Sequence, residues 1–109
     1  MNCIILIGRL TRQPELRVTQ GGTSVTTVTV AVDRRQSENR EKETDFIDCV
    51  IWGRMAEAVC QYMDKGRQIG VKGRLQSRSW ETQDGQKRRA WEVVADEVEF
   101  LGSRSDNDG

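Results

Sequence analysis

The chain has 109 residues and a mass of 12.4 kDa, which is the size of one small domain. Its 17 basic and 17 acidic residues cancel, and no apolar run reaches the roughly 18 residues that a membrane-spanning helix needs. The first residues include no basic segment, and Arg9 interrupts the apolar run too early for a signal peptide. We therefore expect a cytoplasmic protein that does not enter a membrane.

The three cysteines, Cys3, Cys49 and Cys60, are an odd number without CxxC spacing, and the chain contains no histidine. This composition argues against a disulfide framework and against a zinc site. We expect Cys49 and Cys60 to be small buried side chains with free thiols. We expect no metal and no cofactor.

Basic residues gather in one part of the chain. Residues 65–91 contain eight Lys and Arg residues and two carboxylates, a net charge of +6, so the remaining residues together carry −6. A surface that binds phosphates needs such a local excess, because binding depends on the local field and on counterion release rather than on the net charge of the chain. The alternative interpretation is a basic hairpin that is only solvated.

The first predicted strand is the apolar run from Cys3 to Leu10, which is rich in β-branched residues and too short for a stable helix. Glycines and a proline then interrupt the chain before residues 24–35, SVTTVTVAVDRR, which alternate more clearly than any other segment. The charged segment 37–43, SENREKE, has no apolar anchor and predicts a mobile hairpin tip.

The next predicted strand, DFIDCVIW at residues 45–52, has two different faces. Alternation directs Ile47, Cys49 and Ile51 toward a core. The opposite face carries Phe46, Asp48, Val50 and Trp52, and two large aromatic side chains are unusual on a face that points outward.

A helical period follows from Gly53 to Lys65. Its apolar stripe predicts a short amphipathic helix packed on the sheet, and Gly66 stands where a C-terminal cap is expected. The stripe consists of Met55, Val59, Tyr62 and Met63.

A long hairpin completes the pattern. Its first strand runs from residue 69 to about 81, its tip contains the turn pair Asp84-Gly85, and its second strand, AWEVVADEVEFL, breaks alternation near Asp96, which indicates a bulge. The first strand directs small and apolar groups inward and turns Lys72, Arg74, Gln76, Arg78 and Trp80 outward. Residues 103–109 contain no apolar side chain and predict a disordered tail.

These elements predict an all-β fold, a five-stranded antiparallel OB-fold barrel with one short helix between its third and fourth strands. The barrel is expected to span residues 1–102. A sandwich without a helix is the main structural alternative, and the helical period of residues 54–65 argues against it.

Several linked motifs resemble those of the bacterial single-stranded DNA-binding proteins over nearly the whole span of residues 1–102. They are GRLTRQPELRVTQGG at 8–22, VTVAVDR ending at 34, TDFIDCVIWGRMAE at 44–57, KGRQIGVKGRLQSRSW at 65–80, and the ending EVVADEVEFL. The resemblance implies an OB-fold, commonly a homotetramer, that wraps single-stranded DNA without strong sequence preference in replication, recombination and repair. It also implies a location at the nucleoid.

The same resemblance implies that Phe46, Trp52 and Trp80 stack on bases. This role fits their outward positions, since unpaired bases expose flat faces and phosphates that aromatic rings and cations can bind. We expect Arg54, Lys72, Arg74 and Arg78 to follow the DNA backbone, with Lys65, Arg35 and Lys87 as weaker candidates.

Each aromatic assignment has an alternative. Trp52 and Phe46 could pack beneath the helix or at a subunit contact, and Trp80 could be a cross-strand partner of Trp91, which we expect to be structural. The apolar first strand could also pair edge to edge with a second copy.

Two positions depart from the family pattern. Gln36 stands where the family usually carries another stacking aromatic, and Asp48 puts a carboxylate on the presumed DNA face. Both predict weaker or more salt-sensitive binding. The ending SDNDG is a third departure, so recruitment of repair enzymes through an acidic C-terminal tip is not predicted for this chain.

Two other functional classes remain open at this point. A nuclease would need a carboxylate cluster for a divalent metal, and the only tight acidic group is Asp96, Glu97 and Glu99 on a predicted strand. We therefore expect no enzyme activity. The second class is a replication-restart accessory or protein-interaction OB module, which would bind DNA weakly. Gln36, Asp48 and the neutral net charge favour it, and the aromatics at 46, 52 and 80 disfavour it.

Overall fold

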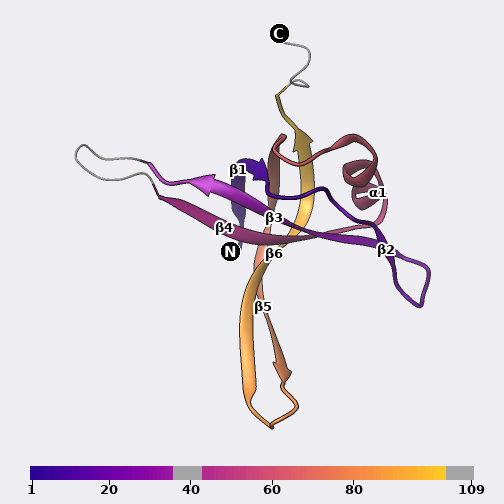
Figure 1. Cartoon of the computed structure of the whole chain (residues 1–109), viewed down its shortest axis with the longest axis vertical. Coiled ribbons are helices and arrows are strands. Elements are labelled where there is room, and N and C mark those ends of the chain that lie inside the picture. The colour runs from indigo at the N-terminus through magenta and orange to yellow at the C-terminus, as the bar shows by residue number, and fades with distance from the viewer. Residues whose placement is uncertain (36–42, 103–109) are drawn as a thin grey trace.

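The structure is a computed structural model that describes residues 1–35 and 43–102. It contains strands β1 (Ile4–Leu10), β2 (Arg17–Val18), β3 (Ser24–Asp33), β4 (Thr44–Trp52), β5 (Gln68–Glu81) and β6 (Lys87–Phe100), with helix α1 (Gly53–Tyr62) between β4 and β5 (Figure 1). The expectations for Gln36, for most of the hairpin tip at 37–43 and for the tail at 103–109 lie outside the described residues.

The long strands pair in the order β1-β5-β6-β4-β3, and β1 also pairs with β3, so the five strands form a closed ring. The predicted all-β fold, the five strands and the place of the helix are confirmed. One junction differs from the antiparallel expectation, because β4 and β6 pair in parallel at Cys49↔Val93 and Val50↔Val94. The two-residue strand β2, which pairs with the start of β3, was not predicted.

Alternation along the strands decides which side chains enter the ring. Val28, Val30, Cys49 and Ile51 are buried in the core, while Phe46, Asp48 and Trp52 are exposed, as predicted. Val50 lies on the outward face of β4 but is also largely buried, as is its neighbour Val94 on β6.

Two glycines permit the ring to close. A Cβ on Gly8 would lie 2.3 Å from the carbonyl oxygen of Ala31 on β3, and a Cβ on Gly73 would lie 2.0 Å from that of Val94 on β6. Gly73 adjoins a shift in the β5–β6 register, where the pairs pass from Lys72↔Glu97 to Gly73↔Ala95. Asp96 is the extra residue, so the predicted bulge is confirmed.

Helix α1 starts directly after β4, because Gly53 adopts a left-handed φ of 70°. Val59 and Met63 pack in the core as predicted, whereas Tyr62 is exposed and its ring lies 6.4 Å from that of Phe100. The helix ends at Tyr62, three residues earlier than expected. Gly66 has a left-handed φ in the turn that follows, and its N–H donates to the carbonyl of Leu10.

The cysteines are free thiols in the structure. Cys49 is buried as predicted, Cys60 is half-buried, and Cys3 is exposed. Burial raises the pKa of the Cys49 thiol to about 12, because a thiolate in the core would lose its hydration. Within the described residues, no helix is long and apolar enough to cross a membrane.

Two hairpins extend beyond the ring in different directions (Figure 1). One consists of β3 and β4. The other is the β5–β6 arm, residues 76–92, in which the described residues of each strand pair only with those of the other. The turn at its tip contains Gly85 with a φ of 85°, which confirms the turn expected from Asp84-Gly85.

We predict that Gly73→Ala lowers the free energy of unfolding by about 3 kcal/mol, because the new methyl group would overlap the backbone of β6. Gly21→Ala is the matched control, since its φ is not left-handed and its Cβ would meet only the Thr19 hydroxyl at 4.0 Å. Urea unfolding of the two variants measures the difference. Equal midpoints would contradict a close approach at Gly73.

Candidate nucleic-acid interface

One continuous surface joins β4 to the β5–β6 arm. Directly paired residues share a face of a sheet, and the pairs Val50↔Val94 and Arg74↔Val94 therefore connect the outward sides of β4, β6 and β5. We call this surface the outer face. Its members on β4 and β5 are Phe46, Asp48, Val50, Trp52, Arg74, Gln76, Arg78 and Trp80.

Three aromatic side chains are exposed on the outer face. Phe46 is 67% exposed, Trp52 43% and Trp80 42%. Phe46 lies on the β3–β4 hairpin and Trp80 lies near the tip of the β5–β6 arm, so the two rings stand on elements that diverge in Figure 1. The core that α1 covers lies on the other side of β4, so Phe46 and Trp52 are not packed beneath the helix.

Trp80 is held in place by a small polar network. The guanidinium carbon of Arg78 lies 4.7 Å from the centroid of the Trp80 ring, a cation–π contact. Arg78 also donates to Glu92 at 3.2 Å, and the Glu92 side chain is only 15% exposed. Arg78 therefore orients the indole, and part of its own charge is balanced by Glu92.

The alternative that Trp80 pairs with Trp91 is wrong. Trp80 is opposite Arg88 and Trp91 is opposite Ser77, which puts the two indoles on opposite faces of the arm. A two-residue turn at Asp84-Gly85 would instead pair Trp80 with Arg89 and put both indoles on one face. In the structure Thr82 pairs with Gln86 around a loop of three residues, and that loop length, which the sequence pattern did not indicate, separates the indoles.

The predicted cations fall into two groups. Arg74 and Arg78 lie on the outer face, where Arg74 donates to Asp96 at 3.2 Å, and Arg54 is exposed in the first turn of α1, two residues after Trp52. The others are exposed at more distant places: Lys72 opposite Ile5 and Glu97, Lys65 in the turn after α1, Arg35 at the end of the β3 hairpin strand, and Lys87 at the tip of the arm.

Carboxylates interrupt the outer face near Phe46. Asp48 is exposed and accepts a hydrogen bond of 2.8 Å from the Thr29 hydroxyl, and Asp33 accepts one of 2.9 Å from Thr44. Asp48 therefore lies on the surface where the sequence analysis put it. Its negative charge opposes the binding of a phosphate beside Phe46.

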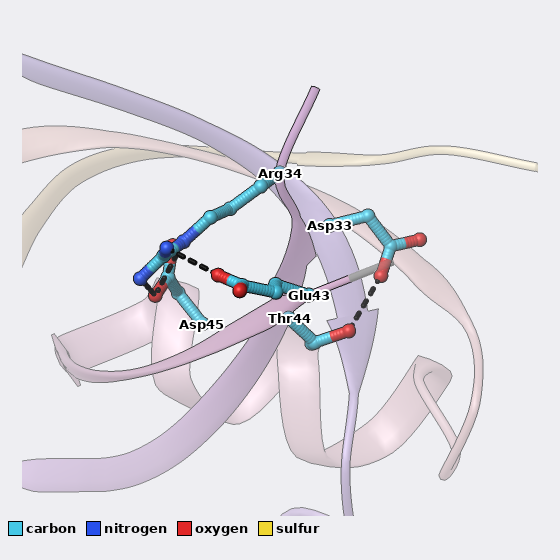
Figure 2. Close-up of polar contacts among 5 residues, drawn as sticks. All are labelled: Asp33, Arg34, Glu43, Thr44 and Asp45. Atoms are coloured by element: carbon cyan, nitrogen blue, oxygen red, sulfur yellow. Dashed lines mark hydrogen bonds and ion pairs between the residues drawn. The ribbon is translucent and has the colours of Figure 1, made fainter. Parts of the chain in front are cut away.

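An ion-pair cluster lies at the loop end of the β3–β4 hairpin, and Figure 2 shows it next to the Asp33 and Thr44 contact. Arg34 donates to Asp45 at 2.9 and 3.0 Å and also pairs with Glu43. The hydrogen bond from Arg34 lowers the pKa of Asp45, and Asp45 in turn raises the pKa of Arg34. Arg34 is thus occupied by carboxylates, and sequence reasoning did not single it out.

This arrangement is suited to binding an extended strand of nucleic acid. Exposed rings offer flat surfaces for stacking, and neighbouring guanidinium and ammonium groups offer charge for phosphates. Within residues 1–35 and 43–102, no group of three or more His, Cys, Asp or Glu side chains is arranged to hold a metal ion.

Comparison with known proteins gives consistent matches. The single-strand binding protein family matches over residues 1–101. The single-stranded DNA-binding protein of Clostridium tetani is 56% identical over 102 residues, which cover 93% of this chain and 70% of that protein. Single-stranded DNA-binding protein 3 of Clostridium acetobutylicum is 50% identical over a region that covers 98% of this chain and 76% of that protein. The single-stranded DNA-binding protein of Bacillus cereus is 49% identical, and the matched region covers 96% of this chain and 62% of that protein.

We predict that Arg78→Lys increases the access of solvent to Trp80, because an ammonium cannot cover the ring as a planar guanidinium does. The free energy of unfolding should fall by about 0.5–1 kcal/mol. Acrylamide quenching in a background where Trp80 is the only tryptophan (W52F/W91F) measures the access. Arg89→Lys, on the opposite face of the arm, is the control, and equal quenching in the two variants would contradict the contact.

Proposed function

The chain belongs to the single-strand binding protein family, and on that premise we propose that it binds single-stranded DNA without sequence preference. The observation that carries the proposal is the outer face, where Phe46, Trp52 and Trp80 are exposed on one continuous surface with Arg74 and Arg78 between them.

In the proposed mechanism the three rings stack on bases of an extended strand. Each stacked base contributes roughly 1–3 kcal/mol, and every base has a face that can stack, so no sequence preference is needed. Duplex DNA already has its bases stacked and paired, which leaves the rings without a partner. Selectivity for the single strand follows from the aromatic side chains.

The cations bind the phosphates in this proposal. Arg74 and Arg78 lie closest to the path between the rings, Arg54 follows Trp52, and Lys72, Lys65, Arg35 and Lys87 extend the surface. Each phosphate contact releases counterions, so affinity should fall with salt. Ion pairs of Arg74 with Asp96 and of Arg78 with Glu92 make these two guanidinium groups weaker phosphate ligands than free cations would be.

We further propose that the protein covers single strands exposed during replication, recombination and repair, at the nucleoid in the cytoplasm, with residues 1–102 as the binding domain. Coating a strand needs no catalytic step, and the proposal assigns none. The bound protein would protect the strand, because DNA whose bases are stacked on the protein and whose phosphates are neutralised is less free to pair or to be cleaved.

We propose a homotetramer as the working assembly. Ile5 and Ile7 are exposed on β1. They line a shallow hollow together with residues of β5 and β6, namely Gly70, Val71, Lys72, Glu97 and Glu99. One edge of β1 pairs with β5, while on the other edge the described residues pair only at Arg9 and Leu10. A second copy could cover the isoleucines and pair with this free edge.

Titration with oligo-dT, followed by tryptophan fluorescence beside a duplex of equal length, tests the function at low and high salt. We expect deep quenching by the single strand alone, weakened at high salt. Absence of quenching with either DNA would overturn the stacking mechanism and favour an accessory OB module that binds a partner protein, which the exposed carboxylate of Asp48 would suit.

We predict that Asp48→Asn strengthens binding to oligo-dT about two- to fivefold at low salt, because it removes a negative charge beside the phosphate path while keeping an acceptor for Thr29. The gain should shrink as salt screens the charge. Asp64→Asn, in the turn after α1, makes the same charge change away from the outer face and should leave the Kd nearly unchanged. Equal effects of the two substitutions would mean that Asp48 acts only through net charge.

A further inference from the structure

The β5–β6 arm has a second face with its own aromatic side chain. Trp91 is opposite Ser77, on the side away from Trp80, and its side chain is 58% exposed. We call this side the back face and define it by Leu75, Ser77, Ser79, Arg89 and Trp91.

Trp91 is exposed because the arm extends beyond the ring. Val93 and Ala95 follow it on the same side of β6 and are buried in the core. At Trp91 the arm has already left the pairing with β4, which reaches only Val93 and Val94. The fold thus leaves more than half of this large apolar side chain exposed, outside the core.

The neighbours of Trp91 leave its ring open. Ser77 across the strand pair and Ser79 beyond it are small hydroxyl side chains, and Arg89 lies two residues away on the same strand. Among the described residues, the ring contacts are those of Tyr62 with Phe100 and of Arg78 with Trp80, so Trp91 differs from Trp80 in having no cation over it. At the tip end of the back face Glu81 is opposite Lys87, but no ion pair joins a carboxylate to Arg89 among the described residues, whereas Glu92 and Asp96 pair with the cations of the outer face.

We propose that the back face is a second base-stacking site for single-stranded DNA, with Trp91 as the stacking residue and Arg89 as its phosphate contact. This inference rests on the proposed function and adds a site to it. The indole offers a flat surface on which a base can stack, and the unpaired cation beside it can bind the neighbouring phosphate. Trp91 and Trp80 are separated along the arm by only about 10 Å, three residues of rise, so one strand can contact both faces as it passes over the arm.

The charge of the back face favours DNA over a second copy of the chain. Arg89 and Lys87 outnumber Glu81 on this face, so two arms packed together through it would bury an excess of positive charge, and charged residues are depleted from the cores of protein interfaces. A polyanion instead gains from the same two cations. A subunit contact through Trp91 is therefore an outcome that the test must distinguish.

Single-tryptophan variants of the full chain test the site. W52F/W80F retains only Trp91, W52F/W91F retains only Trp80, and phenylalanine keeps an aromatic ring at each replaced position. Oligo-dT labelled with a fluorophore at one end reports binding by anisotropy, independently of tryptophan emission. We expect the Trp91 emission to be quenched by oligo-dT, along the anisotropy isotherm, and not by an equal duplex.

Affinity gives a second measurement. Trp91→Ala should weaken oligo-dT binding roughly five- to tenfold, the equivalent of about 1 kcal/mol of stacking, while Trp91→Phe should retain most of the affinity. Tyr62→Ala removes an aromatic side chain of similar exposure on α1 and should leave the Kd unchanged. Thermal unfolding of each variant identifies any loss that is due to folding.

The possible outcomes separate the two proposals. If labelled oligo-dT binds and quenches Trp80 but not Trp91, the back-face site is wrong and the proposed function stands. If labelled oligo-dT does not bind the unmodified chain, the proposed function itself fails. If the emission of Trp91 changes with protein concentration in the absence of DNA, the back face is a contact between copies and the proposed site is wrong.

Discussion

Closure of the strand ring depends on two places where backbones approach more closely than a side chain permits. At Gly8, β1 is still paired with β5 and comes against β3, and at Gly73, β5 crosses β6 closely at the bulge. A sheet of five strands closes only if its strands tilt and coil enough to bring the first against the last. The missing Cβ atoms make that curvature possible, and every exposed element of the molecule is positioned by it.

Because the ring closes with short lengths of each strand, the remaining length of β5 and β6 projects as a two-stranded arm. An arm of this kind has two faces and no core, so aromatic side chains on it stay exposed unless something binds them. Glu92 and Arg78 reduce the resulting freedom at Trp80 by holding the ring in one orientation. The proposed binding surface therefore begins ordered, which lowers the entropy lost when a base stacks.

Neutral net charge is compatible with DNA binding in this fold because the charges are separated in space. Carboxylates form ion pairs with Arg34, Arg74 and Arg78. The β5–β6 arm still contains more basic than acidic residues. The outer face also carries the carboxylate of Asp48, two residues from Phe46 on the same side of β4, and this charge weakens the attraction for phosphates there. In the proposed mechanism affinity then depends on stacking more than on charge.

The sequence by itself determined the strands, the helix, the bulge and the outward positions of Phe46, Trp52 and Trp80, because alternation with a period of two is a local property of the chain. Only the tertiary structure decided the parallel junction of β4 with β6, the pairing of Arg78 with Glu92 and the exposure of Trp91 and Tyr62. Alternation assigns Trp91 to the same side of β6 as Val93, yet Val93 is buried and Trp91 is exposed. Where the ring ends along each strand is set by contacts between distant segments, and no local pattern contains that information.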